Sequence, residues 1–173
     1  MAIRSLKIGE DDNVKGHPFA PVQLIEYGDY ECPYSRKGYR FAQMLLRKRE
    51  GHIYFSFRNF PLRNKHPHAQ MAAEAALAAQ KQGQFWTMHD LLYKNWKQLN
   101  SQKIMELGDR IDFDVSQFKN NLEQREFRNR VATALKEGIS YGVEGTPTFF
   151  INERLYNGNL RYKELQQRVD NYL

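Results

Sequence analysis

The chain contains a single cysteine, Cys32, at a point where a predicted strand gives way to a predicted helix. Residues 22–27 form the short apolar run Val-Gln-Leu-Ile-Glu-Tyr, which is typical of a buried strand. Pro33 suits the first position of a helix, because its missing N–H would have no intrahelical partner there. Unpaired N–H groups and the positive end of the helix dipole both favour a thiolate at this place. The sequence therefore predicts a reactive cysteine.

One cysteine among 173 residues also excludes an internal disulfide, so disulfide bridges do not stabilise this chain. Hydrophobic residues make up 41% of the chain and aromatic residues 13%, which indicates a folded protein with one substantial core. The formal net charge of +6 is most simply assigned to solvated helix faces. An anionic partner such as glutathione or an acidic protein is the alternative, and we expect no nucleic acid.

Periodic patterns predict the remaining elements. Residues 52–58 are rich in β-branched and aromatic side chains, which predicts a second strand. This strand should lie parallel to the first and beside it, because a helix joins them. The other predicted elements are a short strand or arm before residue 21, helices at 32–49, 67–83, 85–96, 101–111, 114–122, 123–141 and 161–172, and a hairpin of 148–151 with 154–156.

The long helix predicted at 123–141 carries an apolar residue at every fourth position: Phe127, Val131, Leu135 and Ile139. This spacing predicts that one face of the helix packs against the sheet.

Three stretches make this order of elements resemble the thioredoxin superfamily, and the helical segment between the strands narrows the resemblance to its DsbA-like branch. They are residues 26–34, with the sequence Glu-Tyr-Gly-Asp-Tyr-Glu-Cys-Pro-Tyr, residues 57–62 and residues 142–152. The first stretch is similar to bacterial thioredoxin-like domains grouped with DsbA, some of which are fused to sodium/proton antiporters. The resemblance implies an α/β thioredoxin-like fold with a helical insertion between the second strand and the long helix before a cis-proline hairpin.

The same resemblance implies a single DsbA-like domain over residues 1–173. We expect the thioredoxin core at about 20–65 and 123–173, and the helical insertion at about 66–122.

The resemblance implies roles for three residues. Cys32 matches the exposed nucleophilic cysteine that begins the family's Cys-x-x-Cys pair. Pro147 matches a proline that follows a cis peptide bond beside this cysteine, and Glu26 matches a buried acid that relays protons. Burial in the apolar strand would raise the pKa of Glu26 and let it exchange protons near neutral pH. Without the resemblance, the same residues would be interpreted as a buried apolar cysteine, a trans proline and a solvent-facing glutamate.

Ser35 departs from the family pattern, because it stands where the second, resolving cysteine belongs. A thiolate at Cys32 can still attack a substrate disulfide and form a mixed disulfide, but no internal thiol can then release the substrate. A second thiol on the substrate, or an external thiol such as glutathione, must do so. The predicted function is thiol–disulfide exchange on protein or glutathione disulfides, by a monothiol enzyme or by a dithiol enzyme whose resolving cysteine has been replaced. No cofactor is predicted, and glutathione is the candidate co-substrate.

The remaining predicted site residues surround Cys32. Pro33 and Tyr34 belong to the active-site motif, and Tyr34 occupies a position that tunes the redox potential in this family. Thr146, next to the cis-proline, is expected to bind substrate backbone as a short β-augmentation. Ser35 is expected to donate a hydrogen bond to the Cys32 thiolate.

Two other functions stay open. Kappa-class glutathione transferases share the DsbA-like fold and activate glutathione with a serine in a Ser-Pro-Tyr-Ser-like sequence, which Pro33-Tyr34-Ser35 matches in part. Their catalytic serine stands at the position of Cys32, however, and a cysteine there favours redox chemistry. The third reading is a redox-inactive binding or chaperone module that kept the substrate groove.

No metal site is predicted, because His66 and His68 lie two residues apart without a thiolate or carboxylate cluster at ligand spacing. Residues 1–8 lack an apolar run of signal-peptide length, and no segment approaches a membrane span. We therefore expect a cytoplasmic chain, or a periplasmic or exported one if it belongs to a longer exported protein. The sequence indicates no oligomeric state.

Overall fold

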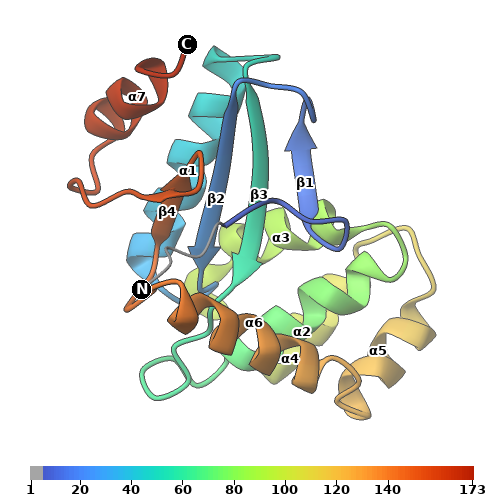
Figure 1. Ribbon diagram of the computed structural model, residues 1–173. Helices are drawn as coiled ribbons and strands as arrows, with labels where there is room; N and C mark the ends of the chain where they lie inside the picture. Colours follow the sequence, from blue (N-terminus) through green and yellow to red (C-terminus); the bar gives the residue numbers. More distant parts are fainter. Residues whose placement is uncertain (1–5) are drawn as a thin grey trace.

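Five strands form one mixed sheet in the order β1-β3-β2-β4-β5, with helices packed around it (Figure 1). The computed structural model describes residues 6–173. Residues 1–5, which belong to the N-terminal segment in which no signal peptide is predicted, lie outside the described residues. The strands are β1 (Asn13–Gly16), β2 (Val22–Gly28), β3 (Ile53–Asn59), β4 (Thr148–Ile151) and β5 (Arg154–Leu155). The helices are α1 (Pro33–Lys48), α2 (Ala69–Gln80), α3 (Phe85–Lys94), α4 (Ser101–Gly108), α5 (Val115–Glu123), α6 (Arg128–Ser140) and α7 (Tyr162–Asp170), with the short 3-10 helix η1 (Trp96–Gln98).

The central strand is β2, which leads directly to Cys32. It pairs in parallel with β3, where Glu26 lies opposite Phe57, and this confirms the predicted strand–helix–strand unit. On its other side β2 pairs antiparallel with β4, where Glu26 lies opposite Phe149. The first strand, β1, comes from the predicted N-terminal arm and pairs antiparallel with β3. Glu26 is therefore enclosed by strands on both sides.

Successive residues of β2 point to opposite faces of the sheet. Leu24 belongs to the larger apolar cluster, which also contains residues of α1, α3 and α7. Ile25 and Tyr27 belong to a smaller cluster, against which Leu135 of α6 packs. Glu26 lies two residues from Leu24 and thus faces the side of the sheet that α1 covers.

Helix α2 is buried on nearly all sides, because α3, α4, α5 and α6 all pack against it. Its buried residues are mostly alanines, which favour the helix and leave room for close neighbours. The charged exception is Glu74, which is 1% exposed and forms an ion pair of 2.7 Å with Arg125. The predicted helical insertion is therefore a packed bundle centred on α2.

The helix predicted at 123–141 begins later than expected, at Arg128. The residues before it form turns, in which Arg125 takes a positive φ of 55° and binds Glu74. The predicted apolar face is also wrong at its end, because Ile139 is 59% exposed while Val131 is fully buried. A spacing of four residues drifts by about 40° per step around a helix of 3.6 residues per turn, so the last member rotates towards solvent. Gly138 instead packs against Phe60 and Tyr27 of the smaller cluster.

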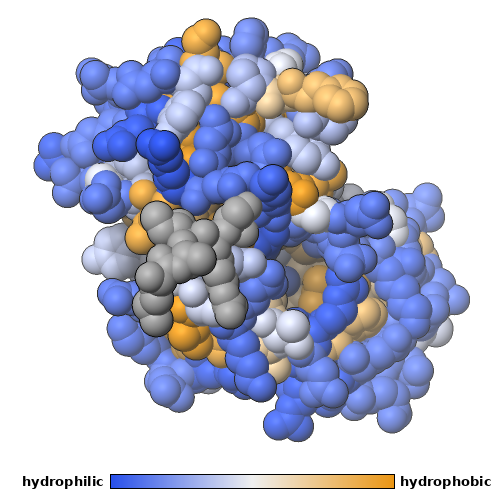
Figure 2. Space-filling view, in the orientation of Figure 1, coloured by the Kyte–Doolittle hydropathy of each residue, from blue (hydrophilic) through white to orange (hydrophobic). Residues whose placement is uncertain are grey.

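The outer surface is mostly hydrophilic on the face shown in Figure 2, where hydrophobic residues are visible in recesses and at a few protruding points. Among residues 6–173, no helix combines the length and the apolar character needed to cross a bilayer.

Candidate active site

Cys32 is the N-cap residue of α1, as predicted, with Pro33 in the first turn of the helix. Its carbonyl accepts a hydrogen bond from Arg36 N at 3.0 Å, and its own N–H donates to Asp29 O at 3.1 Å. The expected exposure is wrong, because only 4% of Cys32 is accessible. The Sγ atom donates to the carbonyl oxygen of Thr146 at 3.5 Å, which accounts for part of this burial. The helix start thus presents a thiol that already has a backbone partner.

The loop that covers this thiol contains the Thr146–Pro147 peptide bond, which is cis, as the resemblance implied. Strand β4 begins directly afterwards, and Thr148 Oγ1 donates to Gly145 O at 2.7 Å to close the turn. A groove of about 380 Å³ opens beside the loop. It is lined by residues of the loop and by Leu155, Tyr156 and Leu160. Residues 114 positions apart in the chain therefore meet at one site.

Glu26 is fully buried, as its strand predicted. Neither of its carboxylate oxygens has a hydrogen-bond partner among the described residues. Burial away from water raises the pKa of Glu26 well above its ordinary value, because the charged form loses hydration without compensation. Burial therefore favours the neutral form of this carboxyl group.

Gly38, which the sequence reasoning missed, brings Glu26 and Pro147 together. A Cβ built on Gly38 would lie 2.7 Å from Glu26 Oε1 and 3.0 Å from Pro147 Cβ. The absence of a side chain thus lets α1 pack directly against both residues. A glycine within a helix that starts at the reactive cysteine was the available signal, since glycine is unfavourable in helix interiors.

Side chains of α1, of the loop before it and of the helical insertion lie near the other side of Glu26. Tyr30 Oη and His89 Nδ1 are 2.9 Å apart, and Tyr39 Oη donates to Asp90 at 2.9 Å. Burial, with a smaller effect of Lys15, lowers the pKa of His89 well below its ordinary value, so the ring is neutral. Glu26, Tyr39, His89 and Asp90 also line a cavity of about 10 Å³, close to the volume that one water occupies.

Ser35 is fully buried, and its Oγ accepts a hydrogen bond from Asp29 N at 3.1 Å. Among residues 6–173 this is its hydrogen-bond partner, so the predicted bond from Ser35 to the Cys32 sulfur is not formed. Tyr34, between the two, is 65% exposed and borders solvent. Of the predicted motif, Tyr34 is thus placed for contact with a partner and Ser35 is not.

The two histidines of the loop after β3 bind carboxylates that precede Cys32. His66 Nδ1 lies 2.8 Å from Asp29 Oδ2, and His68 Nδ1 lies 3.1 Å from Glu31 Oε1. Within the described part of the chain, no group of three His, Cys, Asp or Glu residues has the arrangement of a metal site.

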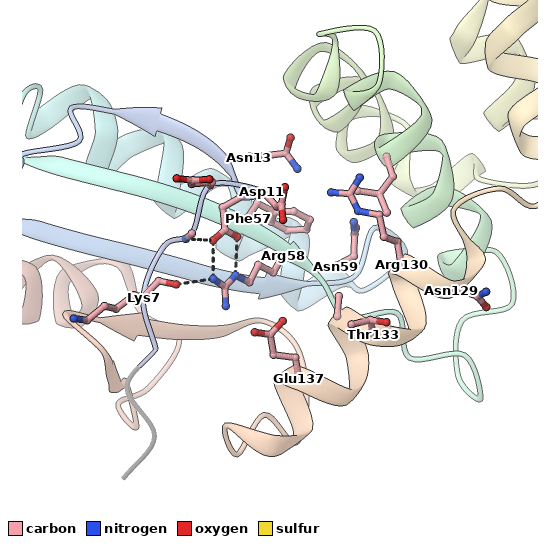
Figure 3. Close-up of a pocket in the computed structure, with 15 residues that line it drawn as sticks. Lys7, Asp11, Asn13, Phe57, Arg58, Asn59, Asn129, Arg130, Thr133 and Glu137 are labelled. Atoms are coloured by element: carbon pink, nitrogen blue, oxygen red, sulfur yellow. Dashed lines mark hydrogen bonds and ion pairs between the residues drawn. The ribbon is translucent and has the colours of Figure 1, made fainter. Parts of the chain in front are cut away.

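A second concavity, of about 590 Å³, lies on the opposite face of the sheet, between the N-terminal arm and α6 (Figure 3). Its charged lining includes Arg58, Arg130 and Glu137. The thiol lies outside this pocket, because Cys32 is not part of its lining.

Comparisons with known proteins agree with this geometry. A family model described as thioredoxin matches residues 9–171. Two curated relatives are Na(+)/H(+) antiporters: NhaA 3 of Salinispora tropica is 38% identical and NhaA 1 of Salinispora arenicola is 39% identical, each over 158 residues. In both cases the match covers 91% of this chain but 24% of the relative. The chain thus spans about a quarter of the length of these relatives.

Solved structures share the fold over nearly the whole chain. A thioredoxin-like oxidoreductase from Silicibacter pomeroyi has a TM-score of 0.79 at 26% identity, covering 94% of this chain and 92% of that one. The thiol-disulfide exchange protein alpha-DsbA2 from Wolbachia pipientis has a TM-score of 0.80 at 19% identity, covering 95% and 88%. Since the family model covers most of the chain, the chain belongs to the thioredoxin family.

Proposed function

We propose that this chain carries out thiol–disulfide exchange through Cys32 alone. The observation that carries the proposal is the meeting of the Cys32 thiol with the Thr146 carbonyl, 3.5 Å apart, at the start of α1. Cys32 is the N-cap residue of α1 and so lies at the positive end of the helix dipole. The names of the DsbA-like neighbours, which include a thiol-disulfide exchange protein, support the same reaction class.

Deprotonation of Cys32 would prepare the site for substrate. The Thr146 carbonyl now accepts the thiol hydrogen, so loss of that proton frees the carbonyl to accept a substrate N–H. A substrate segment would then pair with the loop at Thr146, as in β-augmentation. The thiol and its binding group would thus become available together.

In the exchange step, the Cys32 thiolate attacks one sulfur of a substrate disulfide. A bond from Cys32 to that sulfur forms, the substrate S–S bond breaks, and the released sulfur leaves as a thiolate that takes up a proton. Burial favours the protonated form of Glu26, and Gly38 lets α1 pack directly against this residue, so we assign Glu26 the proton exchange. A second thiol, from the substrate or from glutathione, then attacks the mixed disulfide and regenerates Cys32. The net reaction is isomerisation of a substrate disulfide or removal of a mixed disulfide, and the chain itself stores no disulfide.

The kappa-class transferase alternative receives less support. In that class the catalytic serine stands at the position of Cys32, and the serine that this motif does contain, Ser35, is fully buried and accepts a hydrogen bond from Asp29 N. The antiporter relatives are much longer proteins, of which this chain matches 24%, and we propose no transport function for it.

The test is incubation with oxidised glutathione, followed by intact-mass measurement. We expect one glutathione adduct per chain, which reduced glutathione removes, and no adduct on a Cys32→Ser variant. A wild-type thiol that stays unmodified while a free cysteine peptide reacts would overturn the proposal and favour the redox-inactive module. A Ser35→Cys variant should gain oxidation of a dithiol peptide, because it restores an internal resolving thiol.

A further inference from the structure

A single buried carboxylate holds the loop that leads into Cys32. The side chain of Asp29 has no exposed surface. Its Oδ1 accepts from Glu31 N at 2.8 Å, and its Oδ2 accepts from Leu62 N and from His66 Nδ1, each at 2.8 Å. These three donors come from the loop before α1 and from the loop after β3. Asp29 therefore joins the two loops.

The backbone of the same residue holds the reactive end of the site. Asp29 O accepts from Cys32 N at 3.1 Å, and Asp29 N donates to Ser35 Oγ at 3.1 Å. The side chain thus fixes the position of a peptide unit that in turn orients both the nucleophile and Ser35.

We propose that Asp29 is the positioning residue of this active site, a proposal that rests on the exchange function assigned to Cys32. Its carboxylate holds the turn at 29–32 so that the thiol meets the Thr146 carbonyl. Its N–H engages the Ser35 hydroxyl and keeps it away from the thiol. The hydrogen bond between Asp29 and Cys32 runs through the backbone of Cys32, whereas the sulfur donates to Thr146 O.

Glu31 provides a matched comparison. It also binds the loop after β3, since its Oε2 accepts from His68 N at 2.6 Å and its Oε1 lies 3.1 Å from His68 Nδ1. Among the described residues, however, no hydrogen bond joins Glu31 to Cys32 or Ser35. Both residues place a negative charge near the thiol, and removal of either charge should favour the thiolate. If charge alone mattered, both variants should make Cys32 more reactive. If Asp29 positions the thiol, Asp29→Asn should make Cys32 less reactive, whereas Glu31→Gln should not.

The experiment compares Asp29→Asn with Glu31→Gln. Three quantities are measured at one pH: the rate of Cys32 alkylation by iodoacetamide, the rate of adduct formation with oxidised glutathione, and the thiolate ultraviolet absorbance. We expect Asp29→Asn to slow both reactions by about tenfold, because small misplacements of a reacting group have effects of this size or larger. Glu31→Gln should leave the rates unchanged or raise them. If Asp29→Asn reacts as fast as Glu31→Gln, with more thiolate in both, the positioning role is overturned.

A second pair of variants covers the case in which Asp29→Asn does not fold. His66→Ala removes one donor to Asp29 and keeps both backbone donors, while His68→Ala removes the equivalent contact of Glu31. We expect His66→Ala to slow alkylation by about threefold, with no change in His68→Ala, and equal rates would contradict the proposal. Alkylation requires no disulfide exchange, so a wild type that is alkylated normally but forms no glutathione adduct would refute the proposed function without refuting the positioning role.

Discussion

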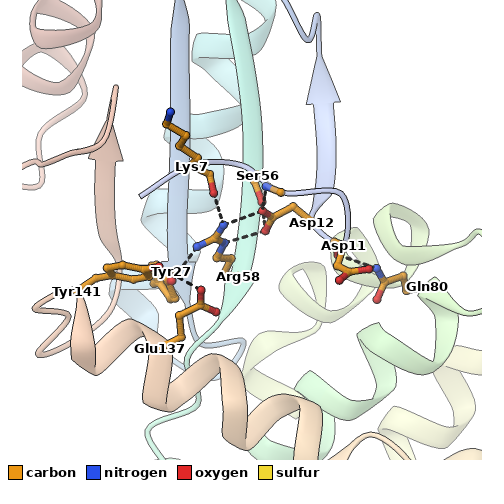
Figure 4. A network of polar contacts seen from close by, with 10 residues as sticks. Lys7, Asp11, Asp12, Tyr27, Ser56, Arg58, Gln80, Glu137 and Tyr141 are labelled. Atoms are coloured by element: carbon orange, nitrogen blue, oxygen red, sulfur yellow. Dashed lines mark hydrogen bonds and ion pairs between the residues drawn. The ribbon is translucent and has the colours of Figure 1, made fainter. Parts of the chain in front are cut away.

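Two carboxyl groups lie on opposite faces of the same sheet and have opposite surroundings: that of Glu26 is fully buried, and that of Asp12 is 10% exposed. Glu26, on the α1 face, has no hydrogen-bond partner among the described residues. Asp12, on the α6 face, accepts from Arg58 Nε at 2.7 Å and Nη2 at 2.7 Å, from Gly9 N at 2.7 Å and from Ser56 Oγ at 3.0 Å (Figure 4). One carboxyl group thus lacks a hydrogen-bond donor among the described residues, and the other accepts four hydrogen bonds.

The pKa values move in opposite directions for this reason. Burial raises the pKa of Glu26 and nothing offsets it. Burial alone would raise the pKa of Asp12 as well, but hydrogen bonds and charge from Arg58 hold it below its ordinary value. The comparison teaches that burial by itself does not identify a functional acid in this molecule. The absence of hydrogen-bond donors is what distinguishes Glu26 from Asp12, because an unpaired buried acid lowers stability.

Replacing Arg58 with methionine removes the cation that pairs with Asp12 and should have the largest effect on stability. It leaves Asp12 charged and buried without its cation, so we expect the free energy of unfolding to fall by about 3–5 kcal/mol at neutral pH. Chemical denaturation measures this loss. The control Arg49→Met breaks the Arg49–Asp170 pair, whose side chains are 26% and 35% exposed, and should change stability little. Equal losses in both variants would show that the buried pair has no special role.

Acid should weaken the same pair. The folded-state pKa of Asp12 is depressed, so its contribution is present above its ordinary value of 3.8 and is lost as the pH falls through the lower folded value. The difference in unfolding free energy between wild type and Arg58→Met should therefore shrink below about pH 4. A difference that stays constant down to strong acid would contradict the ion pair as its source.

Replacing Glu26 with leucine should raise the stability of the protein, in contrast to Arg58→Met. Removal of a buried carboxyl group without partners should raise the free energy of unfolding by about 1–3 kcal/mol at neutral pH. The folded-state pKa is raised, so the stability linked to protonation is fully present below the ordinary value of 4.5 and is lost as the pH rises towards the folded value. The advantage of the variant should grow over that window, by at most about 1.4 kcal/mol per pH unit. Denaturation across pH measures it, and glutathione release from Cys32 should become slower.

The smallest expected effect concerns the contact of α1 with Glu26. Gly38→Ala introduces a Cβ too close to Glu26 and Pro147, and we expect a net loss of about 1–2 kcal/mol after the gain in helix propensity. Gly145→Ala, in the same active-site loop, is the control, because a Cβ there meets no atom within 4 Å. Thermal unfolding of both variants measures the difference. A stable Gly38→Ala with unchanged Cys32 reactivity would mean that the close approach is unimportant.

Much of the fold could be predicted from local patterns. The apolar run of β2, Pro33 after Cys32 and the alanine-rich α2 each depend on neighbours in sequence, and the structure has them in place. The resemblance supplied the meeting of Cys32 with the Thr146–Pro147 loop, which no local pattern contains. The start of α6 and the exposure of Ile139 were mispredicted, because the Arg125–Glu74 pair and the packing of Gly138 against Phe60 come from distant segments.

The sequence by itself therefore determined that a lone thiol begins a helix after a buried strand, without a second thiol to complete a redox pair. Only the tertiary structure decided that this thiol is buried against the Thr146 carbonyl and that Ser35 is bound to Asp29. It also decided that Glu26 has no hydrogen-bond partner among the described residues, whereas Asp12 accepts hydrogen bonds from Arg58, Gly9 and Ser56. The physical reason is that periodicity and capping act over a few residues, whereas the partners of a buried polar group come from wherever the chain folds back.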